Sequence, residues 1–124
     1  MEYSQKFGVH LIIELYGCDV GDLMSINKVY DILRVLPSSM GMNTITLPYV
    51  VKWLDKDTKL EGVSGFTMIA DSHISIHTYP EKRGLFADVF SCRNFHIKRC
   101  LDKFMKTFKA VNYDKKVIKR GLNA

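Results

Sequence analysis

The chain has 124 residues, of which 47% are hydrophobic and 25% are charged, and its formal net charge is +5. This balance is that of one globular domain and excludes a disordered chain, while no apolar run comes near the roughly 18 residues that span a bilayer. Because the N-terminal residues lack the apolar segment of a secretory signal and the cysteines form no C-x-x-C pair, we expect a cytoplasmic protein with free thiols and no membrane partner.

The predicted elements are runs of strand around two helices. β-Branched and apolar residues before Gly17 indicate the first strand, apolar residues at helical spacing indicate the helices, and Pro48 places the second strand at a sheet edge or a bulge. We expect strands over 9–16, 44–53, 66–70, 73–79, 85–91 and 111–118, a charged loop over 54–61, turns at 62–65 and 82–84, a helix over 26–36 that Pro37 and Gly41 end, and a helix that Asn94 caps and that continues to Phe108.

The order of these elements, β-α-β-β-β-β-α-β, predicts the fold class. Antiparallel neighbours need only short turns, as are found here, whereas parallel strands need long crossovers. We therefore expect residues 1–124 to form a single α+β domain, a two-layer sandwich of a mostly antiparallel sheet with two helices on one face.

The stretch from Asp71 to Glu81, DSHISIHTYPE, concentrates the chemically active side chains. From His73 onward apolar and polar residues alternate, which predicts a strand with one apolar face and one face that carries His73, Ser75 and His77. Alternation alone is more typical of an ordinary half-buried strand, so any function has to be argued from the rest of the chain.

Two kinds of binding site are poorly supported. His73 and His77 lie four residues apart, which on a strand separates them by about 13 Å, too far to share one metal ion. Positive charge and the stretch 83–90 resemble an RNA-recognition strand, but Leu85 stands where an aromatic is expected and Asp88 brings a negative charge. We expect no metal site and no nucleic-acid partner, and keep an RNA-binding module as a remote alternative.

Covalent catalysis is a third possibility. Ser72, His77 and Cys92 supply a nucleophile, a base and a thiol acid, and an activated Ser–His pair is a familiar arrangement. The chain has no Gly-x-Ser-x-Gly elbow and no glycine-rich phosphate loop, so a conventional serine hydrolase is not supported.

Four segments in order resemble the prokaryotic S-adenosylmethionine decarboxylases, which process themselves and depend on a pyruvoyl group. They are HLIIELYGCD (10–19), GVSG (62–65), DSHISIHTYPE (71–81) and DVFSC (88–92). The likeness covers roughly residues 9–121.

This resemblance implies that the chain cuts itself between Asp71 and Ser72, into a beta chain of residues 1–71 and an alpha chain of residues 72–124. The Ser72 hydroxyl would attack the carbonyl of Asp71, and elimination followed by hydrolysis would leave a pyruvoyl group at position 72. Serine suits this chemistry because its β-oxygen is first the nucleophile and then the leaving group. The covalent pyruvoyl group is the only cofactor that the resemblance implies.

The resemblance also assigns roles to other residues. The pyruvoyl group forms a Schiff base with the substrate amine and accepts electrons as CO₂ leaves, and Cys92 matches the acid that returns a proton, a task for a thiol with a pKa near neutrality. His77 and Ser64 match residues that assist self-cleavage. Cys18 and Cys100 we expect in the core.

Substrate contacts follow from the same resemblance. Glu81 matches the carboxylate that holds the ribose hydroxyls, Trp53 takes the place of an adenine-stacking aromatic, and Ile74 is expected to contact the substrate. The chain departs from the family at Asp71 and Tyr79, where glutamate and tryptophan are usual, and the loop after Trp53 is longer.

These features are compatible with two kinds of substrate, S-adenosylmethionine or a basic amino acid. S-Adenosylmethionine decarboxylation for spermidine biosynthesis is the leading hypothesis. The alternative is decarboxylation of arginine or ornithine, as in some relatives, because a cationic side chain requires a carboxylate partner and the loop carries Asp55, Asp57 and Glu61.

A homodimer is expected from the spacing of Ser72 and His77. Five residues of strand separate them by about 16 Å and place them on opposite faces, whereas acid–base help requires contact at about 3 Å. No Gly or Pro lies between them to bend the strand. We therefore expect that His77 serves the Ser72 of a second copy, and the resemblance implies the same for Ser64.

Overall fold

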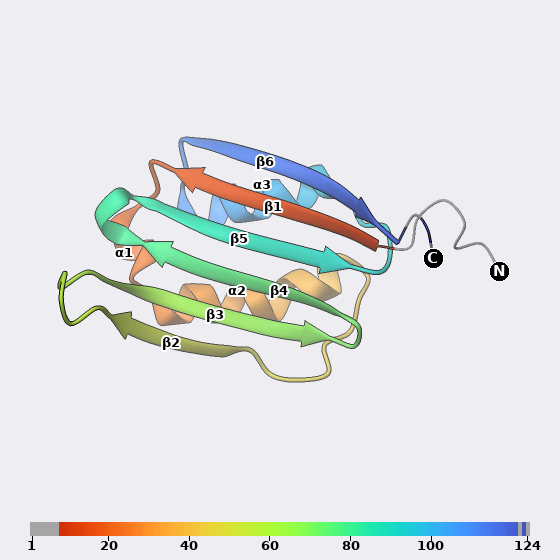
Figure 1. Ribbon diagram of the computed structural model, residues 1–124, viewed down its shortest axis with the longest axis horizontal. Helices are drawn as coiled ribbons and strands as arrows, with labels where there is room; N and C mark the ends of the chain where they lie inside the picture. Colours follow the sequence, from red (N-terminus) through yellow and green to blue (C-terminus); the bar gives the residue numbers. More distant parts are fainter. Residues whose placement is uncertain (1–7, 122, 124) are drawn as a thin grey trace.

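A computed structural model describes residues 8–121 and 123; the prediction for the N-terminal residues 1–6 and the outer limits of the domain lie outside this range. The described residues form a sheet, helices and one 3₁₀ turn (Figure 1). The elements are β1 (Gly8–Tyr16), α1 (Val20–Leu23), α2 (Ile26–Ser39), β2 (Tyr49–Leu54), β3 (Glu61–Ile69), β4 (Ser72–Tyr79), η1 (Pro80–Lys82), β5 (Gly84–Ser91), α3 (Ile97–Phe108) and β6 (Asn112–Arg120).

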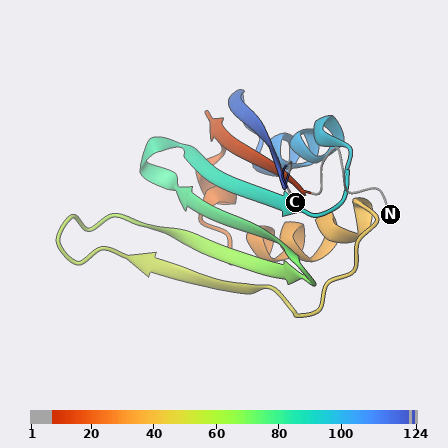
Figure 2. The same ribbon diagram turned by 45° about the vertical axis from the view of Figure 1, so that its right-hand side comes forward.

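The strands form one antiparallel sheet in the order β2-β3-β4-β5-β1-β6. Helix α2 packs on β2, β3 and β4, and α3 packs on β1, so both helices cover the same face (Figures 1 and 2). This arrangement confirms the predicted α+β sandwich. It also confirms the prediction from Pro48, because β2, which begins at the next residue, is an edge strand.

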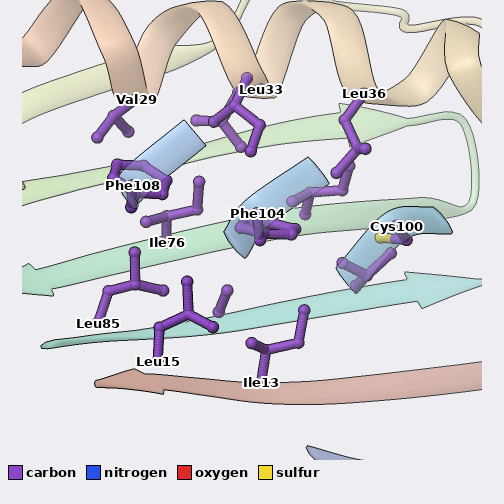
Figure 3. Close-up of a cluster of buried hydrophobic side chains, with 14 of the residues drawn as sticks. Ile13, Leu15, Val29, Leu33, Leu36, Ile76, Leu85, Cys100, Phe104 and Phe108 are labelled. Atoms are coloured by element: carbon purple, nitrogen blue, oxygen red, sulfur yellow. The ribbon is translucent and has the colours of Figure 1, made fainter. Parts of the chain in front are cut away.

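The core lies between this sheet face and the helices. Alternate residues of each central strand point into it, as Figure 3 shows for Ile13, Leu15 and Ile76 beneath Phe104 and Phe108. Each such fully buried side chain contributes about 1.5–3 kcal/mol to folding. Cys18 and Cys100 are buried there as predicted, and burial raises the pKa of Cys18 to about 11 and that of Cys100 to about 12, so both thiols stay protonated.

Two strands begin five residues away from their predicted starts. Strand β2 begins at Tyr49 rather than at residue 44, because Pro48 has no N–H to donate to a neighbouring strand. Gly62 to Gly65 belong to β3 rather than to a turn. At Gly65 a side chain would meet Leu33 at 2.9 Å and Val29 at 3.1 Å, so this glycine lets α2 approach the sheet.

The helix ends also differ. Helix α2 continues through Pro37 to Ser39, since a proline in the last turn removes only one hydrogen bond and its ring is buried here. Helix α3 is capped by His96, whose Nδ1 accepts a hydrogen bond from the N–H of Arg99, and not by Asn94. The short helix α1, which Asp19 caps, was not predicted as a separate element.

The other face of the sheet carries no helix within the described residues (Figure 2). We call it the open face; it displays alternate residues of every strand, among them His73, Ser75 and His77 of β4. Its exposed large apolar residues are Tyr16, Tyr49, Val51, Phe66, Met68, Phe86 and Ile118. None of the helices in the described part of the chain is long and apolar enough to cross a membrane.

Candidate active site

The predicted cleavage point follows a two-residue turn. Ile69 of β3 pairs with Ser72 of β4, so that Ala70 and Asp71 alone connect the two strands. Ala70 has a φ of 54°, in the left-handed region, which costs an L-residue about 1–2 kcal/mol. The peptide bond between Asp71 and Ser72 therefore begins one residue after a strained position.

The side chain of Ser72 is buried, with 5% of its surface exposed, and its hydroxyl is held from two sides. Ser72 Oγ accepts a hydrogen bond from the N–H of Cys92 at 3.0 Å and donates one to Asp71 Oδ1 at 3.2 Å. The thiol of Cys92 donates to the carbonyl oxygen of Asp71 at 3.8 Å. The fold thus brings together the predicted nucleophile, the predicted acid and the carbonyl that this nucleophile is predicted to attack.

The protonation state of Cys92 follows from this position. Burial raises the pKa of its thiol, and the nearby Asp71 raises it further. These effects outweigh the hydrogen bond with Ser72 and the Arg120 charge, which both lower it. The uncut chain therefore does not have the near-neutral thiol that the sequence suggested. The thiol is instead held protonated, as a hydrogen-bond donor to the Asp71 carbonyl.

Ser64 and His77 form a second cluster. They are opposite each other on β3 and β4, and Ser64 Oγ and His77 Nδ1 are joined by a hydrogen bond of 2.7 Å. His77 is exposed on the open face, whereas Ser72 is buried on the helix side. The structure therefore brings Ser64 to His77 but does not bring either to the Ser72 of the same chain, in line with the predicted separation of Ser72 from His77.

An aromatic cavity of about 470 Å³ lies where β4 ends. The ring centroids of Trp53 and Tyr79 are 5.8 Å apart, and those of Tyr79 and Phe86 are 5.1 Å apart. Phe86 was not predicted as a site residue, although the alternation of β5 and the pairing of Phe86 with His77 place it on the open face. The residues that line this aromatic cavity are Leu15, Tyr16, Trp53, Asp55, Leu60, Tyr79, Lys82, Gly84, Leu85 and Phe86.

The remaining predicted contacts lie outside this lining. Glu81 is exposed on η1, next to Lys82, which lines the cavity. Ile74 is fully buried in the core, on the face that the helices cover. No group of three or more His, Cys, Asp or Glu side chains within residues 8–121 is placed to hold a metal ion.

The sequence of this chain is similar to those of known proteins. The family model described as S-adenosylmethionine decarboxylase matches residues 9–121. The S-adenosylmethionine decarboxylase proenzyme of Pyrococcus horikoshii is 34% identical over 116 residues, which are 93% of this chain and 79% of that protein. The proenzyme of Hydrogenobaculum sp. is 32% identical over 120 residues, or 96% and 85% of the two chains.

A solved structure shares the fold. The crystal structure of the adenosylmethionine decarboxylase from Aquifex aeolicus superimposes with a TM-score of 0.77 at 24% identity, and the match covers 94% of this chain and 92% of that one.

Proposed function

Because this chain belongs to the S-adenosylmethionine decarboxylase family, we propose that it is a pyruvoyl-dependent S-adenosylmethionine decarboxylase that cuts itself between Asp71 and Ser72. The observation that carries the proposal is the contact of Cys92 with both the Ser72 hydroxyl and the Asp71 carbonyl. In the cytoplasm its product would supply spermidine biosynthesis.

The residues at the turn fit the formation of a pyruvoyl group. Ser72 Oγ attacks the carbonyl carbon of Asp71 while its proton passes toward the Asp71 carboxylate, which already accepts its hydrogen bond at 3.2 Å. The Cys92 thiol lies against the carbonyl oxygen, where negative charge develops. The C–N bond then breaks, the freed nitrogen takes a proton, and an ester links the two parts of the chain.

Removal of the Cα proton of residue 72 then expels the new main-chain carboxylate of Asp71 from Cβ, which separates chains 1–71 and 72–124 and leaves a dehydroalanine. One water then replaces one ammonia at position 72. The resulting pyruvoyl carbonyl, when present, supplies an electron sink for decarboxylation. In the reaction itself Cys92 would return a proton to the substrate carbon. Burial, the largest cause of its raised pKa in the uncut chain, would keep that proton available at neutral pH.

One chain cannot bind the adenine base of the substrate and also reach its reacting carbon, so the site requires two copies of the chain. Tyr79, at the aromatic cavity, is seven residues along β4 from Ser72, or about 23 Å, too far for one small substrate to contact both. If the open faces of two chains pack with their strands running in opposite directions, the cavity of one lies over the Ser72 end of the other. The same pairing would carry Ser64 and His77 toward the turn at Asp71 and Ser72 of the second copy, which holds the peptide bond to be cut, while the Ser72 side chain itself stays on the helix side. A symmetric dimer forms both sites at once.

The exposed apolar residues of the open face support packing of two chains through this face. The open face displays seven exposed large apolar residues across its strands, and apolar patches of this kind mark interaction surfaces. We therefore propose a homodimer through the open face, with each active site built from both chains.

A second candidate substrate is favoured by one observation. Asp55 lines the aromatic cavity, and a carboxylate there could pair with the cationic side chain of arginine or ornithine. The three aromatic rings favour S-adenosylmethionine instead, since stacking of a base on an aromatic side chain is worth about 1–3 kcal/mol and neither amino acid has a planar ring system to match.

Release of CO₂ from S-adenosylmethionine, arginine and ornithine distinguishes these substrates. We expect kcat/KM for S-adenosylmethionine to exceed the other two by at least about fivefold, the lower end of what one stacked base contributes. Ser72→Ala protein is the blank in each assay. Release of CO₂ from arginine or ornithine alone would leave the pyruvoyl chemistry in place and replace the substrate.

A further inference from the structure

We propose that Gly62 is a positioning residue for the substrate's adenine ring, because the missing side chain at Gly62 is what lets Trp53 face Tyr79. This inference rests on the proposed function and concerns how its base-binding cavity is shaped. It gives a role to the first glycine of the GVSG segment.

Gly62 lies between the two aromatic residues on the open face. It pairs directly with Trp53 of β2, and continuation of the β3–β4 register beyond Ser64 and His77 places it opposite Tyr79. Residues two strands apart are separated by about 9.5 Å at the backbone. The rings of Trp53 and Tyr79 nevertheless approach to 5.8 Å, so they lean toward each other over the intervening glycine.

A side chain at Gly62 would occupy the place of the indole ring. An added Cβ would lie 2.7 Å from Cζ2 and 2.8 Å from Cε2 of Trp53, and 2.3 Å from the carbonyl oxygen of Thr78. Gly62 is not among the positive-φ glycines of the described chain. The glycine is therefore required for space, and Trp53 takes up part of that space.

The same pattern continues across this end of the sheet. Gly84 pairs with Tyr79, and the β1–β5 register beyond Leu15 and Leu85 places Tyr16 opposite Gly84. Rings and glycines thus alternate over five neighbouring strands, as Trp53, Gly62, Tyr79, Gly84 and Tyr16. Because the glycines between the rings have no side chains, the rings can tilt over the flat backbone at these positions, and the resulting surface is suited to a planar base.

None of the proposed cleavage steps uses Trp53, and within its own chain Gly62 is remote from the bond that is cut. It lies opposite Tyr79, about 23 Å along β4 from Ser72. A change at Gly62 that only moves Trp53 should therefore weaken substrate binding and leave self-cleavage intact.

The test uses Trp53 as its own reporter, since it is the only tryptophan in the chain. In Gly62→Ala we expect self-cleavage at the wild-type rate, a shift of the tryptophan emission maximum, and a rise of about tenfold in the KM for S-adenosylmethionine with kcat changed less than about twofold. Gly65→Ala is the matched control on the other face of β3. Its methyl would meet Leu33 and Val50 at 2.9 Å, so it should lower the melting temperature and leave the emission maximum and KM unchanged.

Unchanged emission and KM in a self-cleaving Gly62→Ala protein would overturn the proposal. If Gly62→Ala fails to fold, the double variant Gly62→Ala with Trp53→Ala decides, with Trp53→Ala alone as its control. Recovery of folding in the double variant supports a clash with the indole. Continued failure shows that the contact with the Thr78 carbonyl is by itself enough to require glycine, and the proposal would then be overturned. Failure of the wild-type chain to cut itself would count against the proposed function, and the emission comparison could still be made on uncut proteins.

Discussion

Ser72→Ala protein should remain one uncut chain and release no CO₂ from S-adenosylmethionine. The Ser72 hydroxyl is buried and held between the Cys92 N–H and the Asp71 carboxylate, and alanine offers no oxygen to attack the carbonyl or to leave afterwards. Because the proposed pyruvoyl group would be made from this side chain, activity should fall by at least about 10³-fold, the scale of losing a covalent nucleophile. Denaturing gel electrophoresis and CO₂ release measure the two effects.

Ser75→Ala is the matched control for this variant. Ser75 lies on the same strand but on the open face, where its hydroxyl makes only a long contact of 3.5 Å to Asp88. It should cut itself and decarboxylate like the wild type. Cleavage of Ser72→Ala at the same bond would show that another group is the nucleophile.

Co-expressed Ser72→Ala and His77→Ala chains should recover self-cleavage and activity that neither shows alone. In a mixed dimer one site combines the intact Ser72 of one chain with the intact His77 of the other, while the second site carries both lesions. Random pairing makes half of the dimers mixed, so we expect about a quarter of the wild-type number of sites. Different affinity tags on the two chains isolate the mixed dimer for the assay.

His96→Ala replaces His77→Ala in the control pair, since His96 caps α3 and lies outside the proposed site. Ser72→Ala with His96→Ala should give cleavage only of the His96→Ala chain, with or without mixing. Failure of rescue in an isolated mixed dimer, or full activity of a monomer, would mean that each site is built within one chain.

The fold was predictable because the hydrophobic pattern is regular where the sheet is built. The alternation of β4 and the helical spacing of α3 each survive unchanged in the structure. The strand starts that were predicted wrongly involve glycine and proline. Gly62 to Gly65 were interpreted as a turn from their local preference, whereas the indole of Trp53 and the side chains of α2 occupy the space that these glycines leave in β3. No pattern within the segment reveals such partners.

The residues of the candidate site were proposed from the sequence and stay predictions, whereas their contacts could not be predicted. Ser72, His77 and Cys92 were named from a family resemblance, but the hydrogen bond from Cys92 to Ser72 depends on how β5 pairs with β4, which the sequence does not state. The raised pKa of the Cys92 thiol follows from that contact and from burial. Phe86 was missed because its role as a cavity wall emerges only when three strands lie side by side.

The mass of the purified wild-type protein under denaturing conditions shows directly whether the chain cuts itself between Asp71 and Ser72. We expect two species: residues 1–71, which end at Asp71 with a free carboxylate, and residues 72–124, which begin with a pyruvoyl group. The second species should be lighter by one ammonia than the same segment with a free serine, and should be blocked to N-terminal sequencing. A single chain of 124 residues with Ser72 intact, in a preparation that is folded and inactive, would contradict it.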